Sequence, residues 1–119
     1  MKLKEVQKIL NADILCGEEK LEEEVNSACG SDLMSDVLAF VKDKVLLLSG
    51  LINPQIIRTA EMMDISAIVF VRGKIPDENI LSLAKDKNMI IFSTKCPLYI
   101  ACGKLYSNGL TGEKRGEAS

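Results

Sequence analysis

Three polar segments carry the side chains of this sequence that could do chemistry. Each follows an apolar run, at residues 45–48, 65–71 and 89–92, and is rich in serine, threonine, glycine, lysine or arginine. Small hydroxyls, backbone N–H groups and cationic side chains together suit oxyanions such as phosphate or carboxylate. The pattern therefore predicts a site for a small anionic ligand or a nucleotide, with these candidate residues: Ser49, Asn53, Arg72, Gly73, Lys74, Ser93, Thr94 and Lys95.

The same residue types also have a purely structural use. Serine, threonine and asparagine cap helices, and glycine forms turns wherever a strand meets a helix. Known phosphate-binding motifs do not decide between the two uses, because the sequence contains neither G-x-x-x-x-G-K-[ST] nor G-x-G-x-x-G. Nucleotide hydrolysis is therefore not expected, and anion binding and structural capping both stay open.

Two serine–aspartate pairs form a second candidate group. Ser31 with Asp32, and Ser35 with Asp36, place two carboxylates four residues apart. Magnesium binding would need further oxygen ligands, and the sequence offers none nearby, so helix capping is the favoured interpretation. Ser31 and Asp32 join the candidate ligand-binding residues. No metal ligand and no catalytic residue is predicted.

Composition argues against several classes of function. The 119 residues include 15 Lys+Arg and 17 Asp+Glu, a formal net charge of −2, whereas nucleic-acid binding through phosphate neutralisation needs a basic surplus. The absence of histidine removes His-based triads, the usual general base and the commonest metal ligand. We therefore do not expect His-based catalysis or nucleic-acid binding, and no cofactor is predicted.

Four cysteines, Cys16, Cys29, Cys96 and Cys102, lack the C-x-x-C spacing of zinc ribbons and thioredoxin-like sites. Cys29 and Cys102 lie beside small residues in apolar segments, and we expect buried, reduced thiols. Cys96 differs because it precedes Pro97 at a predicted helix start, where a thiol pKa is lowered. The alternative for Cys96 is a reactive or metal-binding thiol.

The elements that must position these residues alternate between helix and strand. Residues 1–10 have the spacing of an amphipathic helix, and residues 12–16 and 25–29 are short strands. A helix is expected after the first serine–aspartate pair, carrying Leu33, Val37, Leu38, Phe40 and Val41. Three strand–helix units follow, with helices that open at the prolines of positions 54, 76 and 97.

The three apolar strands are separated by spans long enough for crossover helices, which demands parallel pairing with right-handed crossovers. The predicted fold is α/β, a single-domain three-layer sandwich with a mainly parallel sheet flanked by helices. Parallel strands end at one edge of their sheet, so we expect Ser49, Arg72 and Thr94 to come together there.

The sequence also predicts organisation and context. Residues 1–110 form the domain, and the polar residues 111–119 form a flexible tail. No signal peptide or membrane-spanning run is present, so a cytoplasmic protein without membrane contact is expected. A core with five aromatic residues is modest, and association would bury further apolar surface, so we expect a homodimer.

Several segments resemble the DRTGG domain family. Residues 31–39 resemble its SDLLSDVLA signature, residues 68–76 its strand, glycine turn and proline-led helix, and residues 90–106 its closing strand and helix. The likeness runs in order almost to Leu110. Two departures stand out: the Asp-Arg pair that would fall in residues 49–52 is missing, and of the Thr-Gly-Gly turn at residues 71–73 only Gly73 remains.

The resemblance implies a stand-alone member with a fold similar to the N-terminal domain of HPr kinase/phosphorylase, which is not the kinase part. It also implies a non-catalytic regulatory or ligand-sensing accessory module. The alternative is a ligand-free interaction subunit of a larger metabolic or redox (hydrogenase-associated) complex, with a partner enzyme. A third hypothesis is an enzyme or metal protein that uses Cys96 and the serine–aspartate turn.

Overall fold

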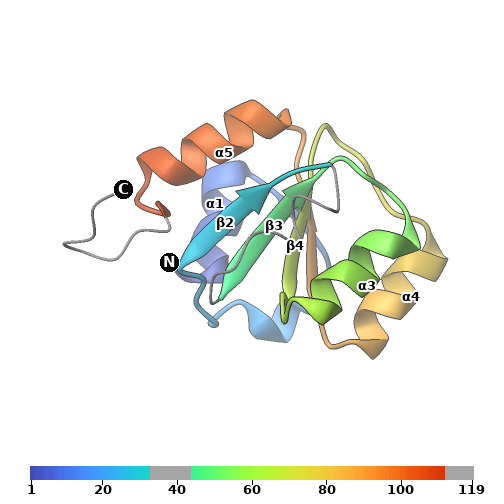
Figure 1. Cartoon of the computed structure of the whole chain (residues 1–119). Coiled ribbons are helices and arrows are strands. Elements are labelled where there is room, and N and C mark those ends of the chain that lie inside the picture. The colour runs from blue at the N-terminus through green and yellow to red at the C-terminus, as the bar shows by residue number, and fades with distance from the viewer. Residues whose placement is uncertain (33–43, 112–119) are drawn as a thin grey trace.

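The three apolar runs form the centre of a five-stranded sheet (Figure 1). The computed structural model describes residues 1–32 and 44–111. The strand order is β1-β5-β4-β3-β2, and the strands are β1 (Asp13–Cys16), β2 (Ser27–Gly30), β3 (Val45–Ser49), β4 (Ala67–Phe70) and β5 (Ile90–Ser93). Neighbours from β2 to β5 are parallel, and β1 is antiparallel to β5. The prediction of a mainly parallel sheet is confirmed.

Helices cover both faces of this sheet, as Figure 1 shows. On one face lie α1 (Leu3–Leu10) and α5 (Leu98–Ser107), and on the other lie α3 (Pro54–Met62) and α4 (Glu78–Asp86). Side chains of β3 alternate between the two layers: Leu46 and Leu48 pack on the α1–α5 side, and Leu47 packs on the α3–α4 side. Every residue of β3, β4 and β5 is buried, which confirms the predicted three-layer α/β sandwich.

Several element boundaries differ from those predicted. Pro76 does not open α4, because Asp77 is the N-cap and accepts the Ile80 N–H at 3.0 Å. Met63 lies just past the end of α3 and is half-buried, whereas Ile56, Ile57 and Ala60 are fully buried. Strand β2 begins two residues later than expected. The predicted helix carrying Leu33, Val37, Leu38, Phe40 and Val41 lies outside the described residues.

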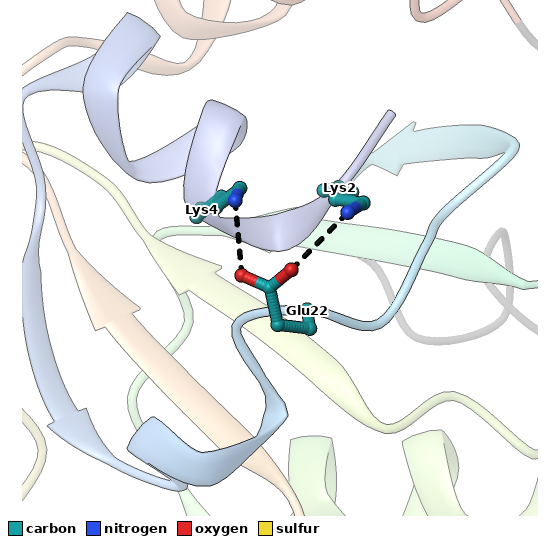
Figure 2. A network of polar contacts seen from close by, with 3 residues as sticks. All are labelled: Lys2, Lys4 and Glu22. Carbon is teal, nitrogen blue, oxygen red and sulfur yellow. Dashed lines mark hydrogen bonds and ion pairs between the residues drawn. The ribbon is translucent and has the colours of Figure 1, made fainter.

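The segment before β2 is fastened to α1 by charged side chains, as Figure 2 shows. The Glu22 carboxylate accepts from Lys2 Nζ at 3.1 Å and pairs with Lys4 Nζ at 3.0 Å. Hydrogen bonds from Lys4 and Lys2, with the charges of both ammonium groups, hold the pKa of Glu22 below its ordinary value. The Glu22 side chain is exposed to solvent. Within the described residues, no helix has the length and apolar character to cross a membrane.

Replacing Glu22 with glutamine should reduce the loss of stability in acid. The lowered pKa belongs to the folded state, so the contribution of Glu22 is fully present above the unfolded-chain pKa of about 4.3. It is lost as the pH falls through the lowered pKa of the folded state. We expect the drop in Tm between pH 7 and acidic pH, at low salt, to be smaller in Glu22→Gln than in the wild type.

The matched control is Glu19→Gln, which removes an exposed carboxylate that has no ion pair among the described residues. This variant should follow the wild-type profile. Equal drops in Tm for Glu22→Gln and the wild type would show that the lysine contacts contribute nothing to folding.

Candidate functional site

The carboxyl ends of the four parallel strands meet at one edge of the sheet, which we call the rim. Backbone hydrogen bonds fasten its loops together: the Val71 N–H donates to the Ser49 carbonyl at 3.1 Å, and the Gly73 N–H donates to the Thr94 carbonyl at 2.8 Å. The Ser31 N–H donates to the Leu48 carbonyl at 3.0 Å. The expected meeting of the β3, β4 and β5 loops is therefore observed.

The loop after β3 holds a carboxylate that belongs to the chain itself. Asp32 Oδ1 accepts the Gly50 N–H at 2.6 Å and the Ser49 hydroxyl at 3.1 Å. The Ser49 Oγ in turn accepts the Leu51 N–H at 3.1 Å. The Gly50 and Leu51 donors, of the kind that would bind an anion, are thus engaged with residues of the chain. Asp32 therefore closes the β3 loop, while the helix that it was expected to cap lies outside the described residues.

The turn after β4 is held by its backbone. Arg72 and Gly73 have φ values of 60° and 69°, in the left-handed region, and their N–H groups donate to the carbonyls of Cys96 and Thr94. These N–H groups therefore do not form a nest for an anion. The Arg72 side chain lies against Gly50, where an added Cβ would stand 2.5 Å from a guanidinium nitrogen. A side chain at position 50 would thus push Arg72 away.

The hydroxyls after β5 also have partners within the chain. Ser93 donates to the Lys74 carbonyl at 2.8 Å. Thr94, which is 2% exposed, donates to the Leu10 carbonyl at 2.7 Å and accepts the Cys96 N–H at 3.3 Å. These hydroxyls hold the rim in shape and tie it to the end of α1.

A cavity of about 310 Å³ opens at the β5 part of the rim. It collects four predicted residues, Gly73, Ser93, Thr94 and Lys95, and adds Asn11 and Asp13, which sequence reasoning did not include; it is completed by Leu10, Ile75 and Cys96. Asp13 lies opposite Ser93 because β1 runs antiparallel to β5, so that β1 starts where β5 ends. The charge of Asp13 alone gave no sign of this position.

The remaining predicted residues lie outside this cavity. Asn53 occupies the N-cap position of α3 and Pro54 its first turn, as predicted, but the Asn53 side chain makes no capping hydrogen bond. Its Oδ1 is buried without a hydrogen-bond partner among the described residues. Asp36, the second carboxylate of the serine–aspartate pairs, falls outside those residues.

Three cationic side chains lie at the rim. The side chains of Arg72, Lys74 and Lys95 are exposed, and none has an ion-pair partner among the described residues. Guanidinium and ammonium groups in this state bind phosphate or carboxylate groups. The electrostatics of the rim therefore suit an anion, bound by side chains rather than by backbone amides.

The cysteines remain free thiols. Burial raises the pKa of the Cys16 and Cys102 thiols, which makes both poor nucleophiles. Cys16 is buried, whereas Cys29 and Cys102 are half-buried rather than fully buried. Cys96 lines the rim cavity, and its Sγ lies 3.6 Å from Lys104 Nζ. Within residues 1–32 and 44–111, no three side chains of histidine, cysteine, aspartate or glutamate gather to hold a metal.

The fold and the rim define a small α/β domain of the kind that offers the carboxyl edge of a parallel sheet to ligands. Residues 5–99 match the model of the DRTGG domain, and the chain belongs to this family. The family resemblance seen in the sequence is confirmed. No curated protein matches the sequence.

A solved structure with the same fold is described as the CBS and DRTGG domains of the regulatory region of Clostridium perfringens pyrophosphatase, complexed with the activator diadenosine tetraphosphate. The TM-score is 0.71 at 17% sequence identity. The match covers 87% of this chain and 45% of that one, so the chain spans less than half of the relative's length.

Replacing Thr94 with valine should destabilise the domain although it keeps the side-chain shape. The Leu10 carbonyl and the Cys96 N–H would lose their partner, and an unsatisfied buried polar group costs roughly 1–3 kcal/mol. Lys95→Ala, at the neighbouring exposed position, should unfold at nearly the wild-type denaturant concentration. If Thr94→Val proves as stable as Lys95→Ala, the hydroxyl does not fasten the rim.

Proposed function

We propose that this DRTGG domain is a non-catalytic regulatory module that binds a small anionic ligand or a nucleotide at the rim. The observation that carries the proposal is the group of exposed, unpaired cations, Arg72, Lys74 and Lys95, beside a cavity of about 310 Å³. A volume of this size is at the lower end of the range for small-molecule sites. The related pyrophosphatase region, which is complexed with a nucleotide activator, supports the same ligand class.

The residues of the rim divide between two roles in this proposal. The anionic group is contacted by Lys95 at the cavity and by Arg72, which lies over Gly50. Asp13 and Asn11 form hydrogen bonds with neutral polar groups of the ligand. Lys74 adds positive charge beside it. The other candidate residues shape the loops around it: Ser31, Asp32, Ser49, Asn53, Gly73, Ser93 and Thr94. Because the nearby hydroxyls and amides have partners, specificity falls to the charged side chains.

The wider context of the module is proposed on the same basis. The proposed domain covers residues 1–110, and Leu110 is buried at the end of this span. The predicted tail at 111–119 lies, apart from Thr111, outside the described residues. The site needs no catalytic residue and no cofactor, since binding alone changes the stability of the loops that close it. We place the protein in the cytoplasm, because nucleotides and phosphorylated metabolites are present there.

A ligand panel tests this function. The Tm of the wild type should rise with at least one nucleotide or phosphorylated metabolite. Arg72→Ala and Lys95→Ala should each weaken its binding by about tenfold or more, because a charge-assisted hydrogen bond contributes roughly 1.5–3 kcal/mol. Lys85→Ala, which removes an exposed lysine in the last turn of α4, is the control and should bind normally. A flat panel, or rim variants that bind like Lys85→Ala, would overturn the proposal.

A second function, protein interaction, is favoured by the outer face of α5. Tyr99 is 87% exposed and Tyr106 is 59% exposed, and together with Ile100 they border an open groove of about 630 Å³. Large exposed apolar groups on one face are typical of association surfaces. We propose that this face joins two copies of the domain, while a partner enzyme on the same face is the alternative.

Sedimentation tests the homodimer. The wild type should sediment as a dimer at micromolar concentration, and the double variant Tyr99→Ser/Tyr106→Ser should be monomeric because the apolar contact area is lost. Met62→Ser removes a side chain on α3 that is 74% exposed, and this control should stay dimeric. A monomeric wild type would refute the proposal, and a dimeric double variant would exclude the α5 face.

A further inference from the structure

The β3 loop has the groups of an oxyanion site, and its present occupant is a carboxylate. The Gly50 N–H and the Ser49 hydroxyl both donate to Asp32 Oδ1, at 2.6 and 3.1 Å. The Arg72 guanidinium packs against the same glycine from the neighbouring loop. A backbone amide and a hydroxyl that meet at one oxygen, with a guanidinium beside the same glycine, are the kinds of donor that bind carboxylate or phosphate in proteins.

We propose that Asp32 is an internal competitor: it fills this oxyanion site in the free protein, and the anionic group of the ligand binds there by displacing the Asp32 carboxylate from Gly50 and Ser49. This inference rests on the proposed ligand-binding function and adds to it the atoms that the ligand contacts and the contact that it must break. The ligand class is any molecule with an accessible oxyanion, either a carboxylate or a phosphate.

Asp32 does not occupy every group of the site, so another anion can replace its carboxylate. Asp32 is exposed, so its carboxylate can return to water when it leaves the loop. No ion pair within 4.0 Å joins it to Arg72, so the guanidinium has not been neutralised by this carboxylate. A phosphate, with more oxygens than one carboxylate contact supplies, could accept from Gly50 and from Arg72 together.

Displacement does not require the sheet to open. The Ser31 N–H remains bonded to the Leu48 carbonyl, so the backbone just before Asp32 is anchored to β3. Gly30 is closely packed as well, since an added Cβ would stand 2.6 Å from Cys102 Sγ. The exchange is therefore a movement of the Asp32 side chain at the end of a fixed strand. An anion that enters also replaces one negative charge beside Arg72 with another.

Chemical rescue tests this inference with simple probes. In Asp32→Ala the site is vacant, so acetate and inorganic phosphate should raise the Tm of this variant more than that of the wild type. The Gly50 amide resonance should shift saturably with either anion. Chloride at equal ionic strength should do neither. Adding Arg72→Ala to Asp32→Ala should abolish the phosphate effect. Asp77→Ala, which removes a carboxylate that caps α4 at the Ile80 N–H, is the matched control and should show no rescue.

Asp32→Asn provides a second measurement that does not depend on the stability of the alanine variant. The neutral amide is a weaker acceptor, so inorganic phosphate and a nucleoside monophosphate should bind this variant about tenfold more tightly than the wild type. Equal gains for the two probes indicate that the oxyanion alone is recognised at Gly50. Unchanged affinity together with an unmoved Gly50 resonance in both variants would overturn the inference.

The two proposals can fail separately. If the wild type binds a nucleotide through Lys95 while Asp32→Asn binds it no more tightly, the displacement is wrong and the regulatory function stands. If Asp32→Ala takes up acetate at Gly50 while no nucleotide or metabolite binds the wild type, the oxyanion site is supported and the regulatory function fails.

Discussion

Three strands with no water-exposed face impose the architecture of this domain. Every residue of β3, β4 and β5 is buried, so helices must cover both faces of the sheet. The chain reaches each next strand through a covering helix, and this crossover leaves the strands parallel. Parallel strands end at one edge, which is why the loops after β3, β4 and β5 share a rim. The hydrogen bonds from Val71 to Ser49 and from Gly73 to Thr94 join these loops.

The rim satisfies many of its own polar groups and leaves its cations free. Thr94, Ser93 and Ser49 bond within the chain, and Asp32 takes the Gly50 N–H. An unpaired buried donor or acceptor would be costly, so these contacts give the edge a fixed shape. The exposed cations, in contrast, remain solvated, and they can exchange water for a ligand without a change in the backbone of the rim. A fixed frame with exchangeable charges is suited to sensing a ligand without transforming it.

The departures from the DRTGG pattern fall on the two loops that touch each other. By the resemblance seen in the sequence, the Asp-Arg pair would lie in residues 49–52 and the Thr-Gly-Gly turn in residues 71–73. In this chain, the glycine at position 50 leaves room for the arginine at position 72. The guanidinium near the β3 loop thus comes from the β4 turn rather than from the loop itself. Membership of the family therefore defines the fold, while the chemistry of this edge has to be argued from the residues present.

The sequence by itself determined the α/β class, the parallel central strands and the loops that form the edge, because apolar runs and prolines act locally and over short spans. It could not decide whether Ser49, Thr94 and Asp32 bind a ligand or the chain, since each has a hydrogen-bond partner 17 to 84 residues away. It also missed Asp13 at the cavity, because only the antiparallel pairing of β1 with β5 brings it there. Those contacts exist only once the sheet has assembled, so the tertiary structure alone assigned them.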